Sequence, residues 1–218
     1  MARPMTDFPD DLDRRGVLIG AGAALLAGGA GSAPVITVLG DSITAGYGLK
    51  MQEALPSQLQ AALARAGVPA RVRGAGVNGD TTAGGLARLE RAVPGDTDVC
   101  VVALGGNDLL TGVSPSRTKA NLDAIVRKLK GRGITPVLAG MRAPPLLGES
   151  YQRAFDAVWP SLAKAHGVAL YPFLLDGVAL NPRYNLSDRI HPNAQGIRII
   201  AERLAPVVAS TLKAGRRA

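Results

Sequence analysis

The stretch that decides the fold is PVITVLGDSIT, residues 34–44, in which an apolar run stops at Gly40 and is followed by Asp41 and Ser42. A continuous run of β-branched and aliphatic residues is typical of a strand buried on both faces, as in a parallel sheet. The carboxyl ends of parallel strands meet at one edge of the sheet, where open α/β folds bind ligands. We therefore expect residues 35–39 to form a strand that delivers Ser42 to a functional edge.

Short apolar runs alternate with amphipathic ones downstream of this stretch, which is the pattern of βαβ units. Further strands are expected at residues 70–74 (a sheet edge), 98–104, 135–139 and 168–171. Helices are expected at residues 55–66, 82–92 with Asp80 or Thr81 as cap, 116–130, 152–165, and from about Asn193 onward. Pro206 should kink or divide the last helix. The sequence therefore predicts one doubly wound, flavodoxin-like α/β domain over residues 34–218, with a parallel sheet flanked by helices.

The composition fits a single folded domain without a metal site. The chain has 218 residues, of which 47% are hydrophobic and 19% charged, so it can bury a sizeable core. Its single cysteine, Cys100, lies in an apolar run and is expected to be a buried strand residue; one thiol excludes an intramolecular disulfide framework. There are two histidines and no H-E-x-x-H pattern. We expect neither a metal nor an organic cofactor.

The chain is strongly basic, with a formal net charge of +8 and a pI of about 10.1. Such a balance is compatible with binding to nucleic acid or to an anionic membrane surface. The basic residues are scattered, however, and only 4% of residues are aromatic, so no stacking platform for bases accompanies them. A solvated basic surface is the preferred interpretation, and no nucleic-acid partner is expected.

The first 33 residues have the layout of an export segment. Arg14 and Arg15 precede an uncharged stretch of small and aliphatic residues up to residue 33, as in a secretory signal. The segment around the arginine pair resembles a twin-arginine signal, although Asp13 and Val17 depart from the usual pattern. We expect export to the periplasm, removal of residues 1–33 and no stable membrane insertion afterwards; an uncleaved amino-terminal anchor is the alternative.

Three loops are expected to converge on one cleft. The second strand leads into residues 74–81, which contain Gly79, and the third ends in Gly105-Gly106-Asn107-Asp108. In a sheet of order 2-1-3, the loops after the first three strands are immediate neighbours, so Ser42, Gly79 and Asn107 would face each other. Taken alone, Ser42 could equally be a loop serine that caps the following turn.

A carboxylate and an imidazole stand three residues apart near the end of the chain. Within one turn, Asp188 can accept the Nδ1 proton of His191, which leaves Nε2 as a base for a serine hydroxyl. Capping of the helix that starts near Asn193 is the alternative role for this pair. His166 is a rival base, but it lies in the last turn of a helix, where a histidine complements the helix dipole, and no carboxylate lies at suitable spacing.

Together these motifs resemble the four blocks of the SGNH (GDSL) hydrolase superfamily. They are Gly40-Asp41-Ser42, Gly79, Gly105-Gly106-Asn107-Asp108 and Asp188-x-x-His191, in the order of the family and over nearly all of residues 34–218. Residues 79–82, residues 85–89 and Tyr171-Pro172-Phe173 are similar to segments of the small bacterial thioesterase, lysophospholipase and arylesterase group. Ile43-Thr44 stands where Leu-Ser is frequent.

The resemblance implies a serine esterase that forms an acyl-enzyme on Ser42, with His191 as general base and Asp188 as its orienter. It also implies an oxyanion hole made by the backbone amides of Ser42 and Gly79 and the side-chain amide of Asn107. Glycine allows close approach of a ligand to the backbone, and an asparagine amide is a neutral donor, so both fit this role. Asp41, Asp80 and Asp108 are interpreted as turn and hydrogen-bonding residues.

Three other functional classes are alternatives to a serine esterase of this family. A classical α/β-hydrolase needs G-x-S-x-G, and Thr44 replaces the second glycine. The stretch from Gly74 to Gly79 matches the G-x-G-x-x-G of dinucleotide-binding oxidoreductases, but a charged strand precedes it. A non-catalytic module that binds lipid or glycan on the same fold is the third class, which the complete set of reacting groups argues against.

The substrate is constrained only to a class. Aryl esters, acyl thioesters and lysophospholipids all fit, as small-molecule or lipid ester substrates. Leu109, Leu110 and Met141, with the residues up to 147, are expected to form walls of the acyl pocket; ordinary hydrophobic packing of these loops is the alternative. The oligomeric state does not follow from the sequence.

Overall fold

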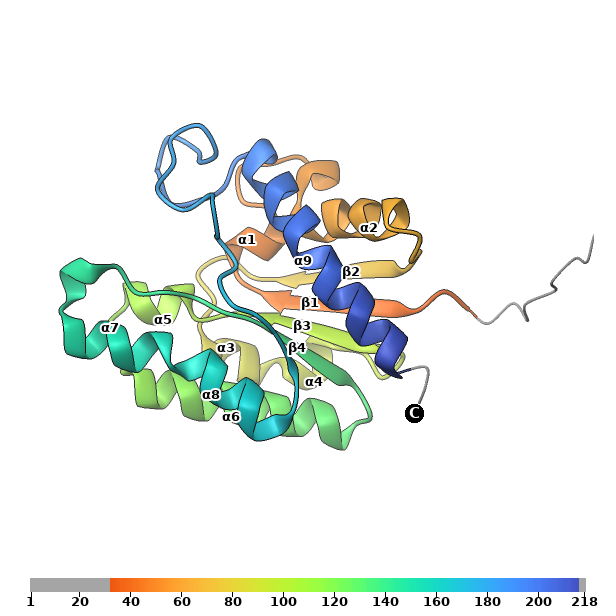
Figure 1. Cartoon of the computed structure of the whole chain (residues 1–218), viewed down its shortest axis with the longest axis horizontal. Helices are drawn as coiled ribbons and strands as arrows, with labels where there is room; N and C mark the ends of the chain where they lie inside the picture. The colour runs from red at the N-terminus through yellow and green to blue at the C-terminus, as the bar shows by residue number, and fades with distance from the viewer. Residues whose placement is uncertain (1–31, 216–218) are drawn as a thin grey trace, which may run out of the picture. The chain divides into compact units, whose positions relative to one another are not determined.

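The computed structural model describes residues 32–215, and the chain divides into two units between Ser32 and Ala33. The expected export segment, residues 1–33, therefore lies outside the described residues except for its last two. The second unit contains a five-stranded parallel sheet and a complete hydrophobic core of its own (Figure 1). Across the sheet the strands are β2 (Arg71–Gly76), β1 (Val35–Gly40), β3 (Val99–Ala103), β4 (Thr135–Ala139) and β5 (Ala169–Tyr171).

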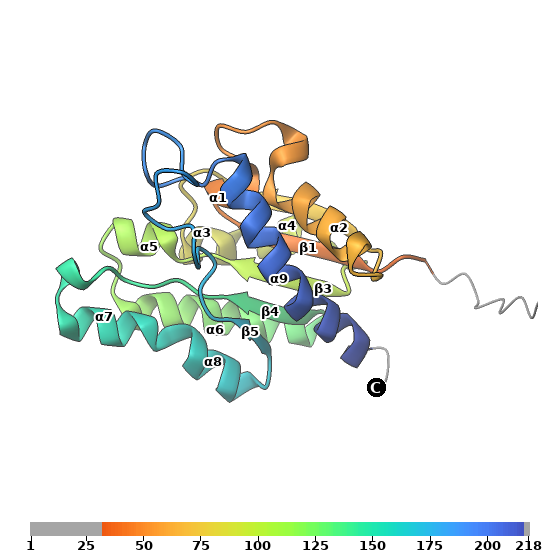
Figure 2. The same ribbon diagram turned by 45° about the horizontal axis from the view of Figure 1, so that its top comes forward.

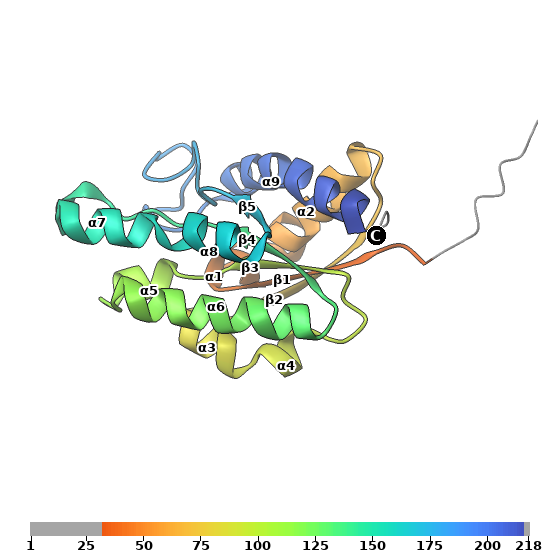
Figure 3. The same ribbon diagram turned by 60° about the horizontal axis from the view of Figure 1, so that its bottom comes forward.

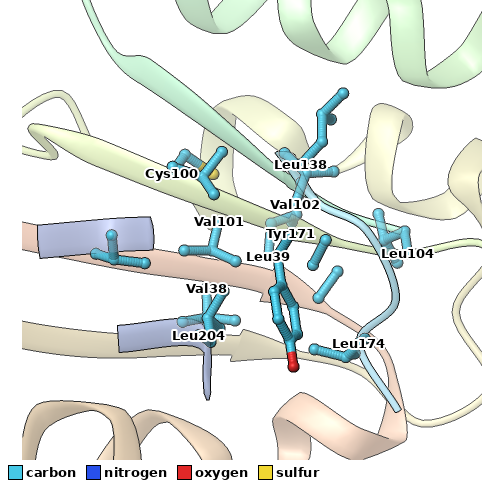
Figure 4. Close-up of a cluster of buried hydrophobic side chains, with 14 of the residues drawn as sticks. Val38, Leu39, Cys100, Val101, Val102, Leu104, Leu138, Tyr171, Leu174 and Leu204 are labelled. Carbon is cyan, nitrogen blue, oxygen red and sulfur yellow. The ribbon is translucent and has the colours of Figure 1, made fainter. Parts of the chain in front are cut away.

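The expected strand order 2-1-3 is confirmed, and it continues as 2-1-3-4-5. The central strands β1 and β3 are almost entirely buried, and their side chains form the cluster in Figure 4 together with Leu138 of β4 and Tyr171 of β5. Gly40, the last residue of β1, is paired with Gly76 of β2 and Ala103 of β3. The loops that follow these three strands therefore begin side by side.

Helices cover both faces of the sheet (Figure 3). On one face α2 (Leu55–Arg65) packs against β2 and against α9 (Ala194–Gly215), which also covers β3, β4 and β5. On the other face α6 (Pro115–Gly131) packs against β4 and against the helices on either side of it, α3 (Thr82–Ala87) and α8 (Val158–His166). The apolar stripes of α2 and α6 supply the buried side chains, as the 3.6-residue period predicts. No helix within residues 32–215 is long and apolar enough to cross a membrane.

The helix expected over residues 82–92 is divided into α3 (Thr82–Ala87) and α4 (Leu89–Ala92). Arg88, the residue between them, has φ −100° and ψ 3°, outside the helical region. Its side chain turns inward and donates to the carbonyl oxygens of Gly40 and Ala75. This tertiary bonding overrides the local helix propensity. Thr81 rather than Asp80 caps α3, accepting from the Gly84 N–H.

Two prolines behave differently. The helix expected over residues 152–165 forms α7 (Glu149–Asp156) and α8 (Val158–His166), because Pro160 has no N–H to offer the carbonyl of Asp156 four residues earlier. Of the two expected effects of Pro206, a kink or a division of the last helix, division is excluded, since α9 runs through it. Pro206 is exposed, so the carbonyl of Glu202 that loses its helical partner lies on the solvent side, where water can bind it.

Four short helical turns escaped the sequence pattern. The α-helices α1 (Ser42–Ala45) and α5 (Gly106–Leu110) follow the carboxyl ends of β1 and β3, and the 3₁₀ turns η1 (Met51–Glu53) and η2 (Pro145–Leu147) follow later in loops. They are too short to show a hydrophobic period. Figure 2 places α1 and α5 on the same side of the molecule as the long loop that precedes α9. The functional edge of the sheet is therefore built from very short elements.

Candidate active site

Ser42 is the first residue of α1, directly beyond the buried strand β1. The carboxylate of Asp41 caps this turn by accepting from the Ile43 N–H at 3.0 Å. The turn packs directly on the end of β2, where a Cβ on Gly76 would lie 2.3 Å from the Ala45 nitrogen. Only glycine permits this approach, and it holds the Ser42 side chain, 8% exposed as a residue, at the sheet edge.

His191 connects Ser42 to Asp188. Its Nε2 lies 2.9 Å from Ser42 Oγ, and its Nδ1 lies 2.7 Å from Asp188 Oδ2. A ring nitrogen facing a carboxylate carries the proton, so Nε2 is the acceptor for the serine hydroxyl. The structure thus brings together the three residues that the sequence predicts as a reacting set, across 149 positions of chain.

Asp188 is held in its charged form. Its Oδ1 accepts from the backbone N–H groups of His191 at 3.0 Å and Ile190 at 2.9 Å. These bonds, the His191 backbone bond first, lower the pKa of Asp188 to about 2, with a smaller effect of the imidazole. Arg189, which follows Asp188, has φ +60°. The tight turn at this residue directs the two backbone N–H groups and the imidazole toward the one carboxylate. Asp188 therefore keeps its charge at neutral pH.

The loop that carries this pair is tied down at its base. Asn185 and Pro192 form an antiparallel bridge, and the Leu186 N–H donates to the His191 carbonyl at 2.8 Å. Asn193 caps α9, because its Oδ1 accepts from the backbone N–H groups of Gln195 and Gly196. The capping role considered for Asp188 and His191 therefore belongs to Asn193.

Tyr47 is a site residue that the sequence analysis missed. Its ring centroid lies 4.4 Å from that of His191, at an interplanar angle of 33°. Its backbone N–H donates to the Ser42 carbonyl, so the ring reaches the imidazole from the turn that carries the serine. The two residues are far apart in sequence, and no spacing could have predicted the contact. The ring covers one face of the imidazole and restricts its rotation.

Asn107 joins the serine loop to the Gly79 loop. Its Nδ2 donates to the Asp80 carbonyl at 2.9 Å and faces Asp41 Oδ2 at 3.5 Å. The second contact is at the outer limit of a hydrogen bond and is weak. Gly79 itself is exposed, with φ +75°. The loops of Ser42, Gly79 and Asn107 therefore meet, as the strand order predicts.

Arg88 is a second missed residue. Besides the two carbonyls at the ends of β1 and β2, Arg88 binds Asp80 Oδ2 through Nε at 2.7 Å. The Arg88 side chain is 13% exposed and the Asp80 side chain 9%. The sequence placed Arg88 inside one continuous helix, residues 82–92, and gave no sign of this inward orientation. It fixes Asp80, whose carbonyl in turn holds the amide of Asn107.

The dinucleotide-binding interpretation does not match the geometry. Gly74 and Gly76 lie inside β2, where Pro56 and α1 occupy the space beside them. A phosphate-binding loop instead needs its glycines in the turn that opens a helix. These two glycines serve the packing of α1 and α2 on the sheet.

The expected pocket walls fall in three environments. Leu109 is half-buried, Leu110 is 64% exposed and Met141 is 5% exposed. The Met141 methyl group packs beneath Gly106 at the start of α5, and Met141 belongs to the hydrophobic core. Leu110 is thus the one of the three that faces solvent.

His166 has a carboxylate partner, contrary to the expectation from spacing. Its Nε2 lies 2.6 Å from Oδ1 of Asp123, on α6. The partner comes from another helix 43 positions away, which sequence spacing cannot reveal. This pair links α6 to α8 on one face of the sheet, whereas His191 binds Ser42.

Other titratable groups have structural environments. Asp108 is fully buried and accepts from the N–H and hydroxyl of Thr82. Cys100 is buried in β3, as expected, and burial raises the pKa of its thiol to about 12. Among residues 32–215, no three His, Cys, Asp or Glu side chains are grouped as a metal site requires.

Comparisons with known proteins agree with this geometry. Residues 38–199 match the model of the GDSL-like lipase/acylhydrolase family. The chain is 36% identical over 171 residues to an arylesterase of Vibrio mimicus, covering 78% of this chain and 86% of that protein. It is 36% identical over 177 residues to the thioesterase 1/protease 1/lysophospholipase L1 of Escherichia coli, covering 81% and 84%. The solved SGNH-hydrolase family esterase AlinE4 is 43% identical, with a TM-score of 0.69 over 84% of this chain and 98% of that one.

The environment of Asp41 predicts a pH-dependent stability. Burial raises the pKa of Asp41 from 3.8 to about 6, against the opposing effect of its bond to Ile43. Well below pH 3.8 the carboxyl is neutral in both folded and unfolded chains, whereas above pH 6 folding must bury its charge. Wild-type stability should therefore fall, relative to Asp41→Asn, by about 3 kcal/mol at most as the pH rises from 4 to 7. Urea unfolding of both proteins across this range measures the difference; a difference independent of pH would contradict it.

Proposed function

Because this chain belongs to the GDSL-like lipase/acylhydrolase family and is a carboxylic ester hydrolase, we propose that Ser42 is its nucleophile, His191 its general base and Asp188 the orienter of that base. The observation that carries the proposal is the hydrogen-bonded chain from Ser42 Oγ through His191 to Asp188, at 2.9 and 2.7 Å. The first distance lies within the range needed for proton transfer from nucleophile to base, and the second is a hydrogen bond that orients the base.

In the first half-reaction the Ser42 hydroxyl proton passes to His191 Nε2 as Oγ attacks the carbonyl carbon of the ester. The tetrahedral intermediate collapses, the bond to the leaving oxygen or sulfur breaks, and His191 returns the proton to that atom. Water repeats the sequence on the acyl-enzyme and releases the acid. Asp188 stays ionised throughout and stabilises the imidazolium, which fits its lowered pKa.

We further propose that the backbone amides of Ser42 and Gly79 and the side-chain amide of Asn107 form the oxyanion hole. The bond from Asn107 to the Asp80 carbonyl fixes the plane of its amide. The remaining N–H makes only the 3.5 Å contact with Asp41, so a substrate oxyanion can replace that weak partner. A donor fixed before the reaction costs little reorganisation when charge develops.

The substrates are small-molecule esters, and aryl esters, acyl thioesters and lysophospholipids fit the names of the relatives. We propose that Leu110, exposed on the helix of Asn107, contacts the acyl chain, that Leu109 lies beside it, and that Met141 supports α5 from within the core. We propose no role in binding nucleic acid, because the unpaired basic residues are spread over several elements.

We also propose export to the periplasm through the amino-terminal segment. Support comes from the sequence alone: the Arg14-Arg15 pair, the uncharged stretch behind it, and the small residues that precede Pro34.

The nucleophile assignment is tested by covalent labelling. A fluorophosphonate should label the protein once, and Ser42→Ala should lose both the label and, by about 10⁴-fold or more, the hydrolysis of a soluble aryl ester. Ser187→Ala, an exposed serine of the His191 loop, is the matched control and should keep both. Labelling of Ser42→Ala at the normal rate would refute the assignment.

The role of Asn107 is tested by separating catalysis from folding. Asn107→Ala should lower kcat by about 10²–10³-fold with little change in KM, because the lost donor acts on charge that develops only in the transition state. Asn78→Ala, an exposed asparagine beside Gly79, is the control and should keep its kcat. If Asn107 only supports the turn, Asn107→Ala will have a lowered melting temperature and a nearly normal kcat.

The export proposal is tested by fractionation and amino-terminal sequencing. A periplasmic species that starts between residues 31 and 35 is expected, and replacing Arg14 and Arg15 by lysine should block its appearance if the twin-arginine route is used. Finding only intact chain in the cytoplasm would refute export, and periplasmic chain from the lysine variant would indicate another route.

A further inference from the structure

The large apolar side chains that the described residues expose all lie at one edge of the sheet. Four of them follow the first three strands: Tyr47 and Met51 after β1, Val77 after β2 and Leu110 after β3. Single exposed apolar residues are ordinary, but their restriction to the edge that carries Ser42 is not expected from chance placement.

The other four follow the last two strands. Leu146 and Leu147 belong to the loop after β4, and Leu180 and Ile190 belong to the loop after β5. Met51, Leu146 and Leu180 are 85%, 84% and 81% exposed, so they pack against almost nothing within residues 32–215. We call these eight side chains the apolar rim.

Basic side chains stand among the residues of the apolar rim. Lys50, Arg142, Arg183 and Arg189 are exposed in the same loops, and none of them forms an ion pair with another residue of the described chain. Arg142 and Arg183 lie over the rings of Phe173 and Tyr184, but no carboxylate of the described chain offsets the charge of these four side chains.

The negative charges are, by contrast, already engaged. Every carboxylate side chain within residues 32–215 accepts a hydrogen bond or forms an ion pair inside the protein. The acceptors are Asp41, Glu53, Asp80, Glu90, Asp96, Asp98, Asp108, Asp123, Glu149, Asp156, Asp176, Asp188 and Glu202. Seven of them, Asp80, Glu90, Asp96, Asp123, Glu149, Asp176 and Glu202, pair with an arginine or a lysine, which offsets their charge. The other six are bound by backbone N–H groups or neutral side chains and keep their negative charge.

We propose that the apolar rim and its basic residues dock on an anionic lipid surface, with Ser42 facing the interface. Apolar side chains enter the boundary between headgroups and acyl chains, and nearby Lys and Arg bind the anionic headgroups. Lipid esters then reach the serine without leaving the interface. Docking would thus make lipid esters the substrate class of the proposed esterase site. That conclusion about the substrate rests on the proposed function, whereas docking on the lipid surface does not.

The test measures vesicle binding by the chain that begins at Ala33, which contains the whole sheet and core, with Ser42→Ala to prevent hydrolysis. It should co-sediment with vesicles of equal parts phosphatidylcholine and phosphatidylglycerol, bind pure phosphatidylcholine weakly, and dissociate from the anionic vesicles at high salt. Because Ser42 is absent, the result stands whether or not Ser42 is the nucleophile.

Two variants separate the contributions. Met51→Gln/Leu146→Ser/Leu180→Asn should weaken binding at least tenfold, since each side chain loses apolar area that would enter the interface. Asn is chosen at position 180 because Leu180 has φ +60°, which Asn tolerates. Lys50→Gln/Arg183→Gln should weaken binding to the anionic vesicles about tenfold or more and leave binding to pure phosphatidylcholine unchanged.

The matched control is Lys164→Gln/Lys213→Gln, two exposed lysines near the carboxyl ends of α8 and α9, at the opposite edge of the sheet. It should change affinity less than about threefold, because the edges lie farther apart than the Debye length. Equal losses of vesicle affinity in Lys50→Gln/Arg183→Gln and in Lys164→Gln/Lys213→Gln would overturn the proposal, because they would indicate diffuse electrostatic attraction.

Two further outcomes would also overturn it. One is binding to anionic vesicles that the triple apolar variant retains in full. The other is a dimer of the parent chain that the triple variant dissolves, which would assign the apolar rim to a second copy of the chain. With Ser42 restored, the double variant Met51→Gln/Leu180→Asn, which leaves the expected pocket residues 141–147 intact, should hydrolyse a short soluble aryl ester at the normal rate and a long-chain ester in anionic vesicles more slowly.

Discussion

The geometry of the active edge depends on one buried guanidinium group, that of Arg88. It donates to Gly40 O, the last carbonyl before the serine turn, and to Ala75 O near the end of β2, each at 2.9 Å. It also pairs with the carboxylate of Asp80, next to Gly79. A buried cation is stable only when its donors are satisfied, so all three partners must stay in place together. The separation of the serine and Gly79 loops is thereby set by a rigid planar group rather than by flexible loops.

The sequence predicted those features that local patterns determine and missed those that pairs of distant residues determine. The apolar run 34–40 and the amphipathic stripes predicted the strands, most helices and the sheet order, from which the meeting of Ser42 and Asn107 followed. The division of the helix at Arg88 could not be predicted, because it follows from contacts with two strands. The partner of His166 and the contact between the rings of Tyr47 and His191 are likewise pairs without a spacing rule. The break before Pro160 could have been predicted, since a proline has no N–H for the helical hydrogen bond to the carbonyl four residues earlier.

Two carboxylates beside the site show how environment assigns a role to the same functional group. Asp188 lies at the surface in a turn of backbone donors, which stabilise its charge and lower its pKa to about 2. Asp41 is buried one residue before Ser42, and burial raises its pKa to about 6. The full negative charge thus faces the imidazole, where the proposed mechanism develops positive charge. The carboxyl group near Asn107, where the proposed mechanism develops negative charge on the substrate, is the one whose ionisation the fold disfavours.

The order of the reacting groups along the chain also times when the enzyme becomes active. Ser42 lies on the first strand of the sheet, whereas His191 lies 149 positions later, just before the last helix. At a synthesis rate of roughly 5–20 residues per second, about 7–30 s separate the appearance of the proposed nucleophile from that of its proposed base. A nascent or truncated chain therefore carries a serine with no histidine to activate it.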